Sequence, residues 1–188
     1  MTALDINQQI EKWLHSRVSS AQADNRPFIT LSYAQSWDGS ITTRSGEAMN
    51  FSGEQSMRLT HQLRSLHDGI LVGIGTVLSD DPQLTVRGWA GSNPRPIVLD
   101  SQLRTPQSAK ICHHPDKQCW ILTVRPEAES LGEKVDILTV PGADSNEEQV
   151  SLQAAMHLLY ERGVKSLMVE GGATVITAFL KARLADAL

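Results

Sequence analysis

The sequence has 188 residues, with 17 Lys and Arg against 21 Asp and Glu, which gives a net charge of −4. A chain of this length can form one domain with a substantial core, and the acidic balance argues against nucleic-acid binding. Two cysteines cannot build a disulfide framework, and no apolar run approaches the roughly 20 residues of a membrane span. With no secretory signal visible, we expect a cytoplasmic protein that binds neither nucleic acid nor membrane.

The first 25 residues are predicted to form a helical extension ahead of a main domain over residues 26–188. Apolar residues between Ile6 and Val18 recur at helical spacing, and a polar stretch then leads to Arg26-Pro27. Such a helix either caps an edge of a sheet or docks onto a partner subunit. We favour the cap.

Strand and helix patterns alternate through the main domain. We predict strands at 28–35, 69–74, 97–99, 120–124, 137–140 and 167–169, with a short return at 40–43 after an Asp38-Gly39 turn. Helices are predicted at 52–67, 147–162 and 173–183, the first opened by a capping box of Ser52 and Gln55. This alternation indicates an α/β fold with a mostly parallel sheet flanked by helices. Ligands in such sheets bind beyond the carboxyl ends of the strands, here the loops after Gln35, Ile74, Leu99 and Val169.

The strongest local motif is the strand-to-helix junction around Gly171-Gly172. An apolar strand ends at Glu170, and a helix begins after the glycines. The free N–H groups and dipole of that helix start favour a phosphate or pyrophosphate, although a glycine turn needed only for its dihedrals fits equally well. Glu170 lies at the strand tip, where it either bonds ligand hydroxyls and moves a proton or is a solvated loop acid.

Other short motifs carry weaker signals. Gly73 and Gly75 follow a strand, but Leu78 breaks the dinucleotide fingerprint. Asp80-Asp81-Pro82 is typical of an Asx turn. The segment Cys112-His113-His114 with Cys119 lacks the ligand spacing of a zinc site, so no metal is expected.

Two arginines are candidates for binding an anion. Arg64 borders an apolar helical stripe of Leu59, Leu63 and Leu66, and Arg87 ends an extended segment. Each alone is most simply a surface charge, but two guanidinium groups near one crevice suit bidentate contact with a phosphate.

Six segments in order resemble the reductase domain of bacterial riboflavin biosynthesis, a family with a dihydrofolate-reductase-like fold. They are residues 26–31 (RPFITL), 36–39 (SWDG), 45–47 (SGE), 69–87 (GILVGIGTVLSDDPQLTVR), 95–101 (RPIVLDS) and 169–173 (VEGGA). The resemblance implies NADPH-dependent reduction of a phosphoribosylamino-pyrimidine, with a hydride going to C1 of the ribosyl group to give a ribityl chain.

The resemblance also assigns site residues by position. Cofactor contacts would come from Ala34, Thr76, Asp80, Ser101 and the stretch from Gly172 to Ala178, which includes Ala173, Thr174 and Val175. Substrate contacts would come from Arg64, Leu84, Arg87 and Glu170, with the two arginines on the 5′-phosphate. Glu170, or a water it holds, would assist proton transfer, and Asp38 is a weaker catalytic candidate. A 2′-phosphate would meet Arg104 or Arg125, and the sequence leaves that choice open.

Departures from the family keep alternatives open. The chain has Ser32, Ala48 and Asn50 where the family often carries Lys, Ser and Trp. It ends at Leu188, before the family's last strands, so we expect an exposed edge that belongs to a fragment or is covered in a homodimer. The alternatives are a reductase of the same fold for another pyrimidine or pterin, and a non-catalytic nucleotide-binding or interaction module. Which pyrimidine base is used stays open.

Overall fold

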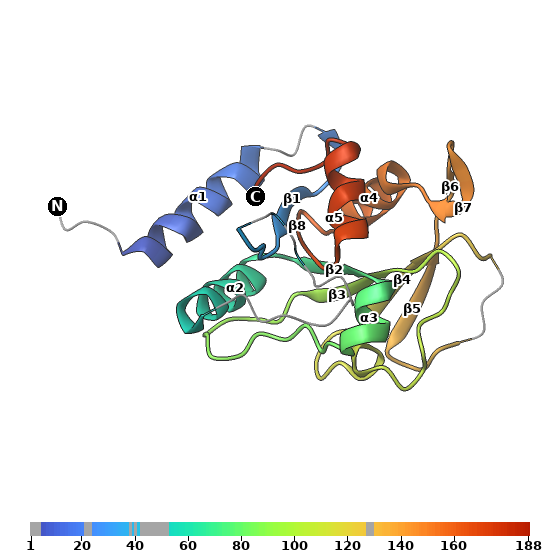
Figure 1. The fold of residues 1–188 in the computed structure, drawn as a ribbon, viewed down its shortest axis with the longest axis horizontal. Helices are drawn as coiled ribbons and strands as arrows, with labels where there is room; N and C mark the ends of the chain where they lie inside the picture. Colours follow the sequence, from blue (N-terminus) through green and yellow to red (C-terminus); the bar gives the residue numbers. More distant parts are fainter. Residues whose placement is uncertain (1–4, 21–23, 38, 40, 42–52, 127–129) are drawn as a thin grey trace.

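The protein is built around a six-stranded, all-parallel sheet with the order β1-β8-β2-β3-β4-β5 (Figure 1). The computed structural model describes residues 5–20, 24–37, 39, 41, 53–126 and 130–188. The strands are β1 (Phe28–Ser32), β2 (Gly69–Gly73), β3 (Arg95–Leu99), β4 (Cys119–Thr123), β5 (Val135–Thr139) and β8 (Ser166–Glu170). The predicted parallel α/β fold is therefore confirmed, with strand boundaries shifted by a few residues.

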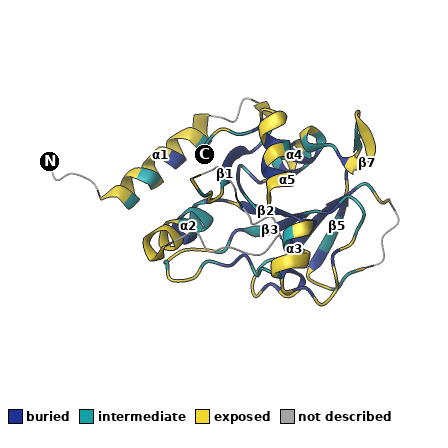
Figure 2. Ribbon diagram, viewed as in Figure 1, coloured by how far each residue is buried: buried dark blue, intermediate teal, exposed yellow. Residues whose placement is uncertain are grey.

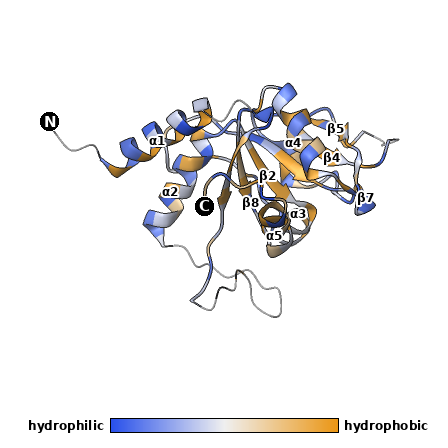
Figure 3. Cartoon of the chain, turned by 90° about the horizontal axis from the view of Figure 1, so that it is seen from above, coloured by the Kyte–Doolittle hydropathy of each residue, from blue (hydrophilic) through white to orange (hydrophobic). Residues whose placement is uncertain are grey.

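The central strands are apolar on both faces because helices cover both sides of the sheet. Every residue of β2 is buried, and its side chains alternate between two cores. Leu71 packs with residues of α4 (Leu152–Glu161) and α5 (Ala173–Lys181). Ile70 and Val72 pack on the other face with α3 (Ile74–Asp80) and a 3-10 turn at Lys110–His113. Figure 2 shows the buried strands between exposed helix surfaces, and Figure 3 shows the hydrophobic residues concentrated along these strands.

The N-terminal helix α1 (Ile6–Ser20) packs beside α2 (Glu54–Leu66) and the start of β1. Gln62 of α2 donates from Nε2 to the Asn7 carbonyl at 2.9 Å, and the ring of Trp13 meets Phe28 edge-on at 6.2 Å. Leu14 is buried in this contact. The helix thus lies against the edge strand β1, as expected of a cap, and the docking alternative stays a prediction. No helix among the described residues is long and apolar enough to cross a membrane.

Two local predictions are wrong, and one short helix was not predicted. Residues 147–150 form the end of β7 (Asn146–Val150), which pairs with β6 (Gly142–Ala143), and α4 starts only after the cap residue Ser151. Residues 74–80 form the short helix α3, which sequence patterns did not indicate because glycines at 73 and 75 are unfavourable in a helix. Helix α2 is capped by Gly53 rather than by Ser52, which lies outside the described residues, as do positions 38, 40, 42 and 43 of the predicted turn and return.

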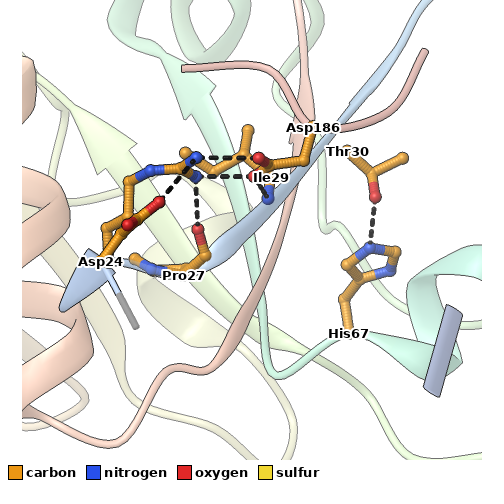
Figure 4. Close-up of polar contacts among 7 residues, drawn as sticks. Asp24, Pro27, Ile29, Thr30, His67 and Asp186 are labelled. Carbon is orange, nitrogen blue, oxygen red and sulfur yellow. Dashed lines mark hydrogen bonds and ion pairs between the residues drawn. The ribbon is translucent and has the colours of Figure 1, made fainter. Parts of the chain in front are cut away.

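The last residues of the chain lie against the outer edge of β1. Ala187 forms a parallel bridge with Thr30, and Leu31 N–H donates to the Ala187 carbonyl at 2.9 Å. Asp186 accepts two hydrogen bonds from the Arg26 guanidinium, at 2.6 and 2.8 Å, and one from Ile29 N–H (Figure 4). These contacts occupy the edge of β1 at this point, and the expectation of an exposed edge in the sheet stays a prediction.

Candidate active site

A cavity of about 1050 Å³ opens at the carboxyl ends of the strands, where sequence analysis placed the ligand. Gly73, Leu99 and Glu170 mark the ends of β2, β3 and β8 on its floor. Its walls come from α3, the start of α5, the loop after β3 and the β6–β7 ribbon. Parallel sheets bind ligands at this edge because several loops and helix starts converge there.

Glu170 is held at the cavity wall by Arg64 of α2. The guanidinium donates from Nε and Nη2 to the two carboxylate oxygens at 2.8 and 2.7 Å, and from Nη1 to the Thr85 carbonyl at 2.9 Å. The two side chains are 12% and 16% exposed, so the bidentate pair is shielded from water. The Arg64 guanidinium is therefore paired with the Glu170 carboxylate and fixes its orientation at the cavity.

The buried face of α2 differs from the predicted apolar stripe. His61 and Gln62 are the buried residues of this helix, whereas Leu59 is partly exposed. The reason is that α2 packs its polar side chains onto α1 and onto the extended segment 84–87. Sequence periodicity cannot anticipate a helix that buries polar groups against backbone partners.

Segment 84–87 is fixed along α2 by polar contacts. Leu84 is buried with a φ of 57°, a conformation that is strained for a branched side chain. Thr85 accepts from Arg64, Val86 N–H donates to Asn93 Oδ1 at 2.7 Å, and Arg87 N–H donates to His61 Nδ1 at 3.2 Å. The Arg87 side chain itself is exposed and lies outside the cavity lining.

The junction between β8 and α5 follows Glu170 directly and also lines the cavity. Gly171 has a φ of 141°, and a Cβ there would lie 3.2 Å from Thr76 Oγ1, so this position needs glycine. Gly73 is tighter, since a Cβ there would lie 2.5 Å from Val175 Cγ2. Gly172 caps α5 with no side-chain hydrogen bond among the described residues, and a Cβ there would meet no atom within 4 Å. The open space in front of an uncapped helix start fits the phosphates of a nicotinamide cofactor.

The loop after β3 is pinned to the β6–β7 ribbon. Asp100 is fully buried and accepts from Thr105 N–H and Oγ1 at 2.7 and 2.8 Å. Ser101 Oγ accepts from Val150 N–H at 3.0 Å, and Gln102 donates to the Glu148 carbonyl at 2.8 Å. Because Ser101 Oγ accepts this bond, its own proton can be donated to a ligand.

The structure brings together most of the residues singled out from the sequence. The cavity lining includes Arg64, Thr76, Asp80, Leu84, Ser101, Glu170, Gly172, Thr174 and Val175. Ala34, Arg87 and Ala173 are described but do not line it, and Asp38 lies outside the described residues. Sequence reasoning missed the polar residues of the loop and ribbon, Gln102, Asn146, Glu148 and Gln149. Glu148 and Gln149 lie on a strand that was predicted as helix, and Gln102 lies in the loop after β3, where no motif marked it.

The cysteine motif lies in the core, and the aspartate motif bonds to a neighbouring backbone segment. No group of three or more His, Cys, Asp or Glu side chains within the described ranges is arranged to hold a metal ion. Cys112 and Cys119 are buried in the core below α3, and burial raises the pKa of both thiols. Asp81 accepts from the backbone N–H of Lys110 at 2.8 Å, a bond that lowers the pKa of its carboxyl.

Comparison with known proteins identifies the family. The family model of the RibD C-terminal domain matches residues 27–188. The chain is 36% identical over 177 residues to the 2,5-diamino-6-ribosylamino-4(3H)-pyrimidinone 5′-phosphate reductase of Debaryomyces hansenii, covering 83% of this chain and 70% of the relative. It is 35% identical to the Archaeoglobus fulgidus protein of the same name, covering 86% and 77%.

Solved structures agree with the sequence relatives. The Saccharomyces cerevisiae riboflavin biosynthesis reductase Rib7 superposes with a TM-score of 0.75 at 30% identity, covering 94% of this chain and 79% of Rib7. The Thermotoga maritima deaminase and 5-amino-6-(5-phosphoribosylamino)uracil reductase superposes with a TM-score of 0.75 at 28% identity, and the chain spans 48% of it. Both the resemblance seen in the sequence and the dihydrofolate-reductase-like fold are thereby confirmed, and the chain belongs to the RibD C-terminal domain family.

Proposed function

We propose that this protein is an NADPH-dependent reductase of riboflavin biosynthesis. It converts the ribosyl group of a 5-amino-6-(5-phosphoribosylamino)pyrimidine to a ribityl group. The observation that carries this proposal is one cavity that is lined both by the oriented Arg64–Glu170 pair and by the uncapped start of α5. A sugar held by the pair and a dinucleotide held at the helix start would meet at the strand ends.

The names of the relatives bear on which pyrimidine base the substrate carries, the diaminopyrimidinone or the uracil. The D. hansenii and A. fulgidus relatives, of which this chain covers 70% and 77%, are both named as reductases of the diaminopyrimidinone. We therefore propose the 2,5-diaminopyrimidinone as the preferred base. The uracil form is the second candidate, because the Thermotoga neighbour is named as a uracil reductase.

The residues of the chain have separable roles in this reaction. Bound NADPH would supply a hydride to C1 of the ribosyl group. Gly172, Thr76 and Ser101 would hold the cofactor, so that much of the rate comes from orientation. Both oxygens of Glu170 accept from Arg64, so the orientation of the carboxylate is fixed. Glu170 is thus best suited to orient a water that protonates the opening ring oxygen. Asp38 stays a weaker candidate.

The preference for NADPH over NADH is assigned to Arg104. This side chain is exposed and lines the cavity beside Ser101, whereas the Arg125 guanidinium bonds to Gln102 Oε1. A guanidinium that lines the cavity and has no hydrogen bond or ion pair with another described residue suits a 2′-phosphate. Arg104→Ala is expected to weaken NADPH binding while leaving NADH binding nearly unchanged. Equal losses for the two cofactors would remove Arg104 from this role.

The deciding experiment follows NADPH oxidation at its nicotinamide absorbance with each phosphoribosylamino-pyrimidine in turn. Turnover that is lost in Glu170→Gln, with NADPH binding retained, is the expected result. NADPH binding without turnover on either base would instead support the non-catalytic module. The predicted homodimer and the cytoplasmic location remain expectations, the first open to light scattering.

A further inference from the structure

Helix α2 presents two side chains, His61 and Arg64, to the same extended segment. They are three residues apart and so lie on one face of the helix. Arg64 bonds the Thr85 carbonyl, and His61 accepts the Arg87 N–H two residues further on. The pair thereby holds the backbone from 85 to 87 much as a neighbouring strand would. The proposed catalytic chemistry uses Arg64 but leaves His61 without a role.

The hydrogen bonds of His61 define its protonation state. Nδ1 accepts from Arg87 N–H at 3.2 Å, so this nitrogen carries no proton. An imidazole whose Nδ1 carries no proton is neutral and has its proton on Nε2. His61 is 9% exposed, so water does not compete freely for this contact.

The charges around His61 also favour the neutral ring. Arg64 from α2 and Arg87 from the extended segment oppose a positive charge, and Glu170 from β8 favours one. Burial has the largest effect, and together these causes lower the pKa of His61 below its ordinary value. Protonation would remove the acceptor of the Arg87 N–H and place a third cation beside the two guanidinium groups.

We propose that His61 is a positioning residue that fixes the Arg87 backbone so that the exposed guanidinium meets the substrate phosphate. This inference rests on the proposed function, in which Arg87 binds that phosphate. Arg64 is committed to Glu170 and Arg104 is assigned to the cofactor, so Arg87, which lies outside the cavity lining, is the cation that we assign to an ester extending beyond the cavity. The anchoring works only while the imidazole is neutral, so phosphate recognition weakens as the ring gains a proton.

Two substitutions separate this role from simple packing. His61→Leu keeps bulk but removes the acceptor, and we expect KM for the phosphorylated substrate to rise roughly five- to tenfold, the effect of one lost hydrogen bond. The change in kcat and in KM for the dephosphorylated analogue should be much smaller. His61→Asn places an amide oxygen near the position of Nδ1 and should restore most of the loss. His15→Leu, on the exposed side of α1, is the matched control.

A double mutant and a pH series sharpen the test. In an Arg87→Ala background, His61→Leu should add little, because the side chain that it positions is gone. In the wild type, KM for the phosphorylated substrate should rise relative to that for the analogue as pH falls from 7.5 to 5.5. The rise should be smaller in the His61→Asn variant, where only the second ionisation of the substrate phosphate, at about pH 6, contributes.

An NMR readout keeps the inference testable apart from catalysis. The Arg87 backbone amide should shift along the titration curve of His61 in the wild type and stay constant in His61→Asn. A constant Arg87 amide in the wild type, or equal losses on both substrates in His61→Leu, would overturn the positioning role. Absence of wild-type turnover together with a titrating Arg87 amide would refute the proposed function while the anchoring contact stands.

Discussion

At the scale of single residues, the division of labour between the two arginines matters most. All three guanidinium nitrogens of Arg64 donate hydrogen bonds, two to Glu170 and one to the Thr85 carbonyl. Arg87 is exposed and is tied down only through its backbone N–H among the contacts of the described residues. The two arginines that looked equivalent in the sequence therefore differ. One shapes the site, and the other is available to an anion.

Replacing Arg87 tests this division. Arg87→Ala should lower kcat/KM for the phosphorylated substrate roughly 10- to 100-fold, the cost of losing charge-assisted hydrogen bonds. The dephosphorylated analogue should be nearly unaffected. Steady-state kinetics on both substrates is the measurement, with Arg17→Ala on α1 as control. Equal losses on the two would exclude Arg87 from the phosphate site.

At the scale of elements, the starts of α2 and α5 provide a matched pair. Gly53 and Gly172 are both cap residues with φ of −72° and −74°, and a Cβ at either would meet no atom within 4 Å. They differ in place, because Gly172 lines the cavity and Gly53 does not.

An alanine at each cap should separate stability from binding. Gly172→Ala and Gly53→Ala should change the free energy of unfolding by similar small amounts, about 0.5 kcal/mol. Gly172→Ala should in addition weaken NADPH binding about tenfold, near 1.4 kcal/mol, since the methyl group occupies the space before the helix start. Urea unfolding and cofactor titration measure the two effects. Unchanged NADPH affinity in Gly172→Ala would argue against a cofactor at this wall.

The contact between β1 and the end of the chain is a second element-scale feature. Arg26 donates to both oxygens of Asp186, each side chain about one-fifth exposed, and Asp186 also accepts Ile29 N–H. Arg26 has a weaker, exposed neighbour in Asp24 at 3.8 Å. Asp186→Ala should destabilise the protein by about 1–3 kcal/mol and speed hydrogen exchange at Leu31, whereas Asp24→Ala should cost less than about 0.5 kcal/mol. Similar effects of the two variants would contradict the assigned role of Asp186.

At the scale of the whole molecule, buried histidines set the response to acid. Burial is the largest cause that lowers the pKa of His61, His67 and His114. His67 donates from Nδ1 to the Leu63 carbonyl at 2.7 Å, so its Nε2 accepts from the Thr30 hydroxyl at 2.9 Å (Figure 4). A proton on Nε2 would reverse this hydrogen bond and place a buried positive charge between the C-cap of α2 and β1.

The sign of the pH effect follows from these lowered values. The unfolded chain takes up protons at the histidines near pH 6.5 and the folded protein only at lower pH, so stability is full above that value and falls as pH drops below it. Urea unfolding at pH 7.5 and 5.5 should show the loss. Replacing the exposed His15 should leave it unchanged, and His67→Phe should reduce it. A flat stability between these pH values would show that the rings protonate without cost.

The sequence by itself determined the elements that depend on local chemistry. The unbroken apolar run at 69–73 can only be a strand covered on both faces, and Gly171-Gly172 marks the turn into α5. Val150 fits a helical stripe and an inward-facing strand position equally well, so the start of α4 was misplaced until Ser151 and the pairing of β6 with β7 were seen.

The tertiary structure decided which side chains meet. Arg64 and Glu170 are 106 residues apart, and His61 binds the backbone of a segment 26 residues away. Local periodicity reports which face of an element is apolar, but it carries no information about long-range partners for polar groups. Those partners depend on how strands order themselves in the sheet, and that order brings β8 between β1 and β2 and thereby assembles the cavity.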